Sequence, residues 1–194
     1  MHAIIFVGDS ILTRESQDNV AGLAPRLRLR FRDIEVRIIA AAGSNSSQTL
    51  ASLAGRVLPD DSLVIVSVGM NDAAPWKSVP IKEFKENYTR ILDILGGRLV
   101  ILVTPYPVHT GKQRQPGRNN EVIERYAQVI QELARTHNVA YIDMYSIVYS
   151  TMHTADLHVS DGVHLNDTGY GLLTEAVSPL VEKWLNHKAL RSFQ

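Results

Sequence analysis

Short runs of apolar, mostly β-branched residues alternate along this chain with segments of helical periodicity. Each run has about the length of a strand that is buried on both faces of a sheet. In the segments between the runs, apolar side chains recur every three or four residues, as in helices with one buried face. This alternation predicts an α/β fold with a mostly parallel sheet. The predicted strands are Ala3–Val7, Glu35–Ile39, Leu63–Val68, Leu99–Val103 and Val139–Ile142.

Three predicted helices have a clear apolar stripe, and shorter helices are expected around residues 20–32 and 47–57. Asn166 or Asp167 is a suitable residue to cap the last helix. Because crossover connections between parallel strands are right-handed, the expected form is a three-layer α/β/α sandwich. The three stripes are Ile81, Phe84, Tyr88, Ile91, Leu92 and Leu95; Val122, Tyr126, Val129, Ile130, Leu133 and Ala134; and Leu172, Leu173, Ala176, Val177, Leu180, Val181, Trp184 and Leu185.

The length of 194 residues favours a single domain spanning residues 1–194. Twenty Lys and Arg residues balance twenty Asp and Glu residues, which argues against a nucleic-acid-binding protein, since such proteins neutralise phosphates with excess positive charge. The absence of cysteine excludes disulfides, thiolate metal sites and a cysteine nucleophile. No apolar stretch approaches the roughly 18 residues of a membrane span, and no signal peptide is visible. We therefore expect a cytoplasmic protein without nucleic-acid or membrane partners.

Polar or small residues directly follow three of the predicted strands. Ser10, Gly43 and Asn71 come after the first, second and third strands, and Asp161 and His164 precede the last helix. In a parallel sheet the carboxyl ends of the strands lie at one edge, and ligands bind there. Taken singly, each of these residues is most simply a turn, cap or loop residue. Their common position predicts that they share one cleft.

Acyl transfer is the chemistry that needs this set of residues. A serine becomes nucleophilic when a neighbouring histidine takes its proton, and a carboxylate then holds the imidazole in the correct tautomer. We expect Ser10, His164 and Asp161 to fill these roles. The oxyanion that forms needs preorganised donors. The backbone N–H groups of Ser10 and Gly43 and the side-chain amide of Asn71 are the candidates.

The ordered set of motifs resembles the SGNH, or GDSL-type, hydrolases over nearly the whole chain. The segments that carry the resemblance are Phe6–Ile11, Gly43, Gly69–Asp72 and Asp161–His164. The resemblance implies a flavodoxin-like fold with five parallel strands in the order 2-1-3-4-5. It also implies the same roles for the serine, the histidine, the aspartate and the three oxyanion donors, with no metal or organic cofactor.

The resemblance implies a serine esterase that hydrolyses small, short-chain esters through an acyl-enzyme on Ser10. The segment from Thr104 to Asn120 is most similar to the branch of isoamyl acetate-hydrolysing esterases. Many members have a glycine that residues 11–15 lack, and Ser46 stands where many members have a second glycine. These differences leave the size of the substrate open. Alternatives are a carbohydrate O-deacetylase, a thioesterase, a lysophospholipase and a catalytically silent binding domain. The expected partner is a small-molecule acyl ester, and the apolar faces of the last helix leave a homo-oligomer open.

Two aromatic residues are candidates for substrate binding. Trp76 follows the third motif, where it either lines the cleft or lies half-buried under a loop. Tyr106 follows the fourth predicted strand, at the start of the longest loop of the chain. Long loops in compact domains are often functional. The basic residues Lys112, Arg114 and Arg118 of the same loop are interpreted as solvated surface.

Other acidic and histidine residues offer rival sites. Asp156 and His158 form a second acid–imidazole pair and, with His153, suggest zinc ligands. Asp9 and Asp72 follow strands, as acidic residues do in metal-dependent hydrolases or phospho-acceptor domains. We favour loop-shaping hydrogen bonds for these residues and predict no metal site.

Overall fold

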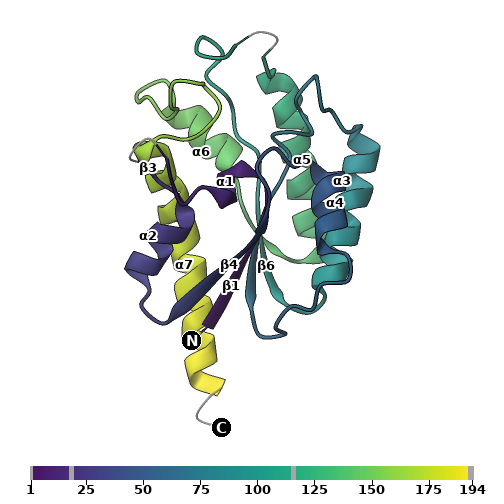
Figure 1. Ribbon diagram of the computed structural model, residues 1–194, viewed down its shortest axis with the longest axis vertical. Coiled ribbons are helices and arrows are strands. Elements are labelled where there is room, and N and C mark those ends of the chain that lie inside the picture. Colours follow the sequence, from purple (N-terminus) through teal and green to yellow (C-terminus); the bar gives the residue numbers. More distant parts are fainter. Residues whose placement is uncertain (1, 18–19, 115–116, 192–194) are drawn as a thin grey trace.

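A five-stranded sheet forms the centre of the computed structural model, which describes residues 2–17, 20–114 and 117–191 (Figure 1). Every pair of neighbouring strands in this sheet is parallel. The strand order is β4-β1-β5-β6-β7, which is 2-1-3-4-5 when these strands are counted along the chain. The expected order is therefore confirmed. The strands are β1 His2–Gly8, β4 Ile34–Ala40, β5 Leu63–Ser67, β6 Leu99–Val103 and β7 Ala140–Ile142.

Helices cover both faces of this sheet and form the two outer layers of the predicted α/β/α sandwich. In Figure 1, α3, α4 and α5 lie on one side of the sheet, and α2 and α7 lie on the other. Most residues of the apolar stripes predicted on α4, α5 and α7 face the core, where Tyr88, Ile130 and Val177 are fully buried, whereas Ile81 at the start of α4 is exposed. The helices are α1 Ser10–Thr13, α2 Leu23–Arg30, α3 Ser46–Leu53, α4 Ile81–Leu95, α5 Asn120–His137, α6 Met144–Thr151 and α7 Asp167–Arg191.

The start of α3 differs from the predicted one because a polar cap decides where this helix begins. The helix expected at 47–57 starts at Ser46, since the Asn45 side chain accepts a hydrogen bond from the Gln48 N–H and the Gln48 side chain bonds back to Asn45. Asn166 rather than Asp167 caps α7, because its side chain accepts from the Gly169 N–H. The short α1, α6 and the antiparallel pair β2 Ser16–Gln17 and β3 Val20–Ala21 were not predicted.

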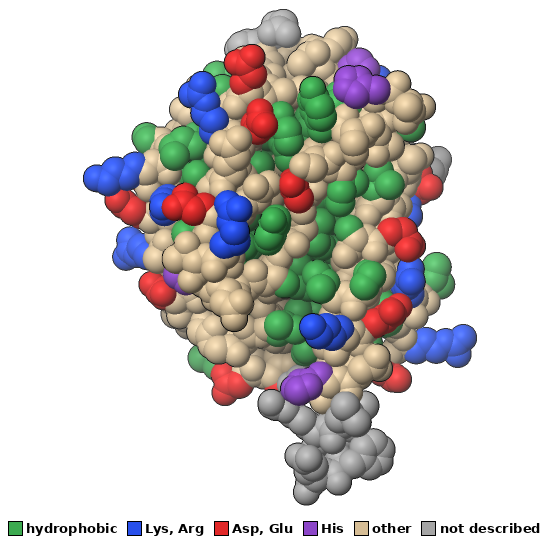
Figure 2. All heavy atoms as spheres, turned by 180° about the vertical axis from the view of Figure 1, so that it is seen from behind, with side chains coloured by type: hydrophobic (Ala, Val, Ile, Leu, Met, Phe, Trp, Pro, Cys, Tyr) green, Lys and Arg blue, Asp and Glu red, His purple; other side chains and the backbone are tan. Residues whose placement is uncertain are grey.

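The rear of the molecule, seen in Figure 2, has hydrophobic side chains along its middle, with charged side chains around them. A hollow of about 700 Å³ is lined by residues of β6, β7 and α7, including Leu99, Ala140 and Leu180. Leu99 begins β6, so this hollow lies toward the amino-terminal ends of the strands. It is therefore separate from the polar edge described next. None of the helices in the described ranges is long and apolar enough to span a bilayer.

The turn after β1 sets the position of the first polar motif. Gly8 ends the strand with φ +152°, and a Cβ atom there would lie 1.9 Å from the Ser67 carbonyl oxygen. Only glycine allows β1 and β5 to approach so closely. The chain can then turn directly from β1 into α1, which places Ser10 at the carboxyl edge of the sheet.

Candidate active site

Three side chains from the two ends of the chain meet at the carboxyl edge of the sheet. The Ser10 Oγ lies 2.9 Å from the His164 Nε2, although the two residues are 154 positions apart. The Nδ1 atom of the same ring lies 2.7 Å from the Asp161 Oδ2. A carboxylate only accepts hydrogen bonds, so Nδ1 carries the proton and Nε2 is free to accept from the serine hydroxyl. The structure thus brings together the serine, histidine and aspartate predicted from the sequence.

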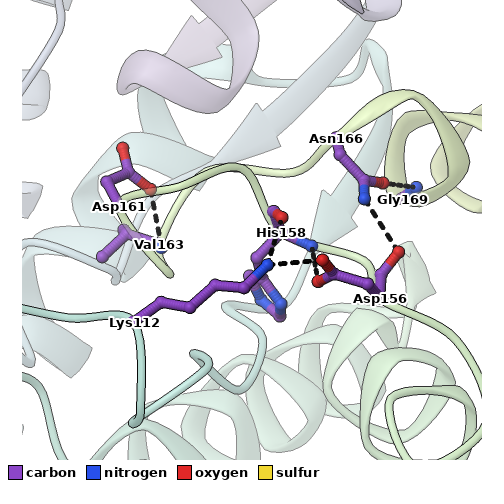
Figure 3. Close-up of polar contacts among 7 residues, drawn as sticks. All are labelled: Lys112, Asp156, His158, Asp161, Val163, Asn166 and Gly169. Carbon is purple, nitrogen blue, oxygen red and sulfur yellow. Dashed lines mark hydrogen bonds and ion pairs between the residues drawn. The ribbon is translucent and has the colours of Figure 1, made fainter.

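Asp161 is held by the backbone of its own loop, as Figure 3 shows for one of its contacts. Its Oδ1 accepts hydrogen bonds from the N–H groups of Val163 at 2.8 Å and His164 at 2.9 Å. Partial burial raises the pKa of the carboxyl group, but the hydrogen bonds from the His164 ring and the two N–H groups outweigh burial and lower it. Asp161 is therefore ionised at neutral pH and can orient the imidazole.

The loop that carries Asp161 packs closely on the loop that follows β6. The His109 N–H donates to the Gly162 carbonyl at 2.8 Å. Gly162 has φ +71°, and a Cβ atom there would lie 2.6 Å from the His109 carbonyl oxygen. A side chain at position 162 would push the two loops apart, so glycine is required for both conformation and space.

The candidate oxyanion donors line the same hollow as the serine and the histidine. This hollow has a volume of about 290 Å³, and its wall includes Ser10, Gly43, Asn71 and His164. Gly43 has φ +77°, a conformation that favours glycine. Space for a side chain is available there, because a Cβ atom would have only the Lys77 Nζ as a neighbour, at 4.0 Å. The backbone conformation, rather than lack of space, therefore favours glycine at this position.

The Asn71 side chain has its amide orientation set by two partners. Its Nδ2 donates to the Ser44 carbonyl at 2.9 Å, and its Oδ1 accepts from the Arg118 Nη2 at 3.0 Å. Arg118 is itself fixed, because its Nε donates to the Met70 carbonyl at 2.8 Å. One hydrogen of the Asn71 amide nitrogen is therefore still available to a ligand in the hollow.

Arg118 is a site residue that the sequence analysis placed on the solvated surface. Its guanidinium lies 5.1 Å from the centroid of the Trp76 ring, a distance suited to a cation–π contact. Lys77, which was not singled out either, donates to the Gly43 carbonyl. The signal that could have pointed to Arg118 is its place on the longest loop, next to the edge where polar motifs gather.

The two aromatic candidates for substrate binding differ in their exposure and in whether they line the site. Trp76 is 58% exposed and lies at the rim of a second hollow that shares Arg118, Asp161 and Val163 with the first. Tyr106 is buried and is not among the lining residues of either hollow. Burial raises the pKa of its hydroxyl well above the usual value. The structure therefore brings Trp76, but not Tyr106, to the site.

The second acid–imidazole pair braces the loop of Asp161 rather than forming another site (Figure 3). Lys112 pairs with the Asp156 carboxylate and donates to the His158 carbonyl at 3.1 Å. The His158 Nε2 donates to the Pro107 carbonyl at 2.9 Å, and burial lowers the pKa of this ring, which is therefore neutral. Within residues 2–17, 20–114 and 117–191, no group of three or more His, Asp or Glu side chains is arranged to hold a metal ion.

Asp9 and Asp72 are buried beneath the site loops. The Asp9 Oδ1 accepts from the Ile11 N–H at 3.0 Å and so caps α1. Asp72 accepts from the Ser46 N–H at 2.9 and 3.1 Å and so holds the start of α3. Burial raises the pKa of Asp9 to about 7, and burial also raises that of Asp72. Both carboxyl groups are buried and bond to backbone N–H groups of the site loops. Their hydrogen bonds therefore shape the loops, as expected from the sequence.

Comparison with known proteins identifies the family. The family model of the GDSL-like lipase/acylhydrolase family matches residues 6–172. The chain is 31% identical to a bovine (Bos taurus) protein named isoamyl acetate-hydrolyzing esterase 1 homolog, over 63% of this chain. It spans 57% of the length of that relative, which is less than two thirds.

Two solved structures are similar to this one. A lipase/acylhydrolase from Enterococcus faecalis superposes with a TM-score of 0.83 and 26% identity, and the match covers 94% of this chain and 96% of that one. The acetyl xylan esterase AlAXEase superposes with a TM-score of 0.76 over 92% of this chain and 99% of that one, at 20% identity, which shows a shared fold. The family match, together with the motifs around Ser10, Asn71 and His164, means that the chain belongs to the GDSL-like lipase/acylhydrolase family, a family of carboxylic ester hydrolases.

Proposed function

We propose that this protein is a serine esterase that hydrolyses small, short-chain carboxylic esters through an acyl-enzyme on Ser10. The observation that carries the proposal is the pair of contacts on one imidazole ring. His164 accepts from the Ser10 hydroxyl at 2.9 Å through Nε2 and faces the ionised Asp161 at 2.7 Å through Nδ1. This is the arrangement that activates a serine nucleophile.

The proposed reaction has two halves. The Ser10 Oγ attacks the ester carbonyl while His164 takes the hydroxyl proton, and the resulting imidazolium is stabilised by Asp161. The carbon–oxygen bond to the alcohol then breaks, and His164 gives its proton to the departing oxygen. In the second half, water attacks the acyl carbon while His164 takes a proton from it. The bond between the acyl carbon and the Ser10 Oγ then breaks, and His164 gives the proton to Ser10. The products are a carboxylic acid, an alcohol and the free serine.

The negative charge that forms on the carbonyl oxygen needs donors that are already in place. We assign this role to the N–H groups of Ser10 and Gly43 and to the free hydrogen of the Asn71 amide. The conformation of Gly43 and the two partners of Asn71 support the assignment, because both groups are fixed before substrate arrives. Donors that need no reorganisation lower the barrier most.

The volume and lining of the hollow favour a short acyl group. About 290 Å³ is lined by the small Ala42 and Gly43 and by apolar Ile11, Met70 and Val163. The name of the bovine relative, an isoamyl acetate-hydrolyzing esterase 1 homolog, fits a small ester. A carbohydrate O-deacetylase is the second candidate, because the exposed Trp76 ring next to the hollow is a suitable surface for a sugar. A silent binding domain is disfavoured by the complete set of polar residues.

Hydrolysis of p-nitrophenyl acetate, butyrate and octanoate tests the proposal. We expect wild type to hydrolyse the acetate and butyrate faster than the octanoate, without inhibition by EDTA. Ser10→Ala should lose nearly all activity because no nucleophile remains. Ser150→Ala is the matched control, since Ser150 is exposed on α6 and bonds only to the backbone of its own helix.

The outcomes separate the candidates. Activity that survives in Ser10→Ala would contradict the serine mechanism, and its loss with EDTA would indicate a metal-dependent hydrolase. Silence on all three esters would contradict the small-ester assignment. Release of acetate from acetylated xylo-oligosaccharides in that case would support the deacetylase, and its absence would support a binding domain.

A further inference from the structure

A second hollow adjoins the catalytic one and is not used by the reaction just described. It has a volume of about 280 Å³. Arg118, Asp161 and Val163 line both hollows, so the two hollows lie side by side. Trp76 and Arg114 line only the second hollow. A group attached to an ester at Ser10 could therefore extend into it.

The charge of the second hollow is positive, although the whole chain has a formal net charge of zero. Lys112, Arg114 and Arg118 line it, and the carboxylate among its lining residues is Asp161. Lys112 is neutralised by its ion pair with Asp156, and the Asp161 carboxylate offsets the charge of Arg118. Arg114 is exposed and has no ion-pair partner among the residues that the structure describes. One positive charge, that of Arg114, is therefore left uncompensated by the described residues.

The hydrogen-bonding groups of this hollow are mostly donors. The Gln113 side chain is already engaged at both ends, because its Nε2 donates to the Arg118 carbonyl at 3.0 Å and its Oε1 accepts from the Arg118 N–H at 2.7 Å. The Asp161 Oδ1 accepts from two backbone N–H groups. Sugar hydroxyls need acceptors as well as donors. An acceptor-rich, negatively charged group fits these surroundings better than a neutral polyol.

The position of the second hollow relative to His164 indicates that it would hold the alcohol part of the ester. His164 gives its proton to the departing oxygen, so the alcohol leaves on the side of the His164 loop. That loop supplies Asp161 and Val163 to the wall of the second hollow. The exposed Trp76 side chain there can also contact a planar or apolar group that joins the ester to the charge.

We propose that the esters hydrolysed at Ser10 carry an anionic oxygen group, a carboxylate or a phosphate, on their alcohol part, and that Arg114 and Arg118 bind this group in the second hollow. Arginine forms paired hydrogen bonds with such groups, and the Arg114 guanidinium is exposed, with no ion-pair partner in the part of the chain that the structure describes. This proposal rests on the serine esterase function. It adds the class of substrate, which neither the family nor the hollow around Ser10 specifies.

Two acetate esters of nearly the same shape test the proposal. 3-Acetoxybenzoate carries a carboxylate, and 3-acetoxybenzamide carries a neutral amide at the same place. We expect kcat/KM to be about tenfold or more higher for the benzoate, because a hydrogen bond to a charged group is stronger than one to a neutral group. The preference should shrink as NaCl is added, since exposed charges are screened.

Arg114→Gln should reduce the ratio of the two kcat/KM values toward one. Arg90→Gln is the matched control, because Arg90 is an exposed arginine on α4 that lines neither hollow, and it should keep the wild-type ratio. Equal kcat/KM values for the two esters in wild type would overturn the proposal while leaving the serine esterase intact. A preference that Arg114→Gln keeps would overturn the assignment of the second hollow.

A binding measurement keeps the proposal testable if no ester is hydrolysed. In calorimetric titrations of the Ser10→Ala protein, 3-hydroxybenzoate or phenyl phosphate should bind more tightly than 3-hydroxybenzamide. The tighter of the two anions identifies the preferred group. Adding Arg114→Gln should remove the difference from the amide. Equal binding of all three compounds would contradict the anion site, and anion binding without ester hydrolysis would contradict only the esterase function.

Discussion

At the scale of single residues, Arg118 connects the parts of the site. It contacts the Asn71 amide oxygen, the Met70 carbonyl and the face of Trp76. Burial lowers the pKa of its guanidinium, and the charge of Asp9 partly offsets this. Because the Asn71 amide is the proposed oxyanion donor, a residue that fixes its orientation acts on catalysis without touching the substrate carbonyl.

We expect the losses of kcat caused by Arg118→Met and Asn71→Ala on a neutral ester to be largely non-additive. Asn71→Ala should lower kcat for p-nitrophenyl acetate by about 100-fold, the usual cost of one oxyanion donor. Arg118→Met should lower kcat more than it raises KM, because it disorders that donor. The double variant should be little worse than Asn71→Ala alone. Kinetic constants for the four proteins check this, and multiplicative losses would show that Arg118 does not act through Asn71.

At the scale of elements, the segment between α6 and α7 carries the catalytic pair and has little regular structure. It is held by a β-bridge within the segment, between His158 and Leu165. It is also held by the contacts of Lys112 with Asp156 and His158 (Figure 3). The hydrogen bond from Lys112 lowers the pKa of Asp156, so this pair is charged at neutral pH. A short loop braced in this way can hold His164 in reach of Ser10.

Removing the brace should affect catalysis more than folding. We expect Lys112→Met to lower kcat for p-nitrophenyl acetate several-fold, because His164 would spend less time in contact with Ser10. The melting temperature should change little, since exposed ion pairs contribute at most about 1 kcal/mol. Lys85→Met is the control, because Lys85 forms a similar exposed pair with Glu132 between α4 and α5. Equal kcat values for the two variants would contradict the bracing role.

At the scale of the whole molecule, two acidic side chains, Asp9 and Asp72, lie buried where the loops meet the core. Burial and the nearby Asp72 raise the pKa of Asp9 to about 7, from 3.8 for the unperturbed group. Between these two values the folded protein holds a proton that the unfolded chain has released. Asp9 therefore makes the free energy of unfolding fall as the pH rises from about 4 to about 7, with no further change above that.

Asp9→Asn should remove this part of the pH dependence. The isosteric amide keeps an oxygen for the Ile11 N–H but does not titrate. Urea unfolding at pH 5 and pH 8 should show a smaller loss of stability in Asp9→Asn than in wild type, by an amount on the order of 3 kcal/mol. The exposed Asp93→Asn serves as the control and should keep the wild-type difference. The same pH dependence in all three proteins would show that Asp9 is ionised in the folded state at low pH.

The predicted strands agree closely with the observed ones, and Leu99–Val103 agrees in both bounds. Strand and helix patterns are local, because each residue faces the core at intervals set by its own element. Short pieces such as α1 and α6 leave no such pattern, which is why they were missed. The motifs around Ser10, Asn71 and His164 were also readable, since each follows a strand or precedes a helix.

What the sequence determined by itself was the α/β architecture, the strand order through the family resemblance, and the identity of the polar residues at the carboxyl edge. The tertiary structure alone decided which of the long-loop residues reach that edge. Arg118 contacts Asn71 across 47 positions, Lys112 contacts Asp156 across 44, and Tyr106 is buried instead of facing the site. These contacts depend on how one loop packs on two others. No periodicity in the chain encodes such packing, because it arises only when the sheet has brought the loops together.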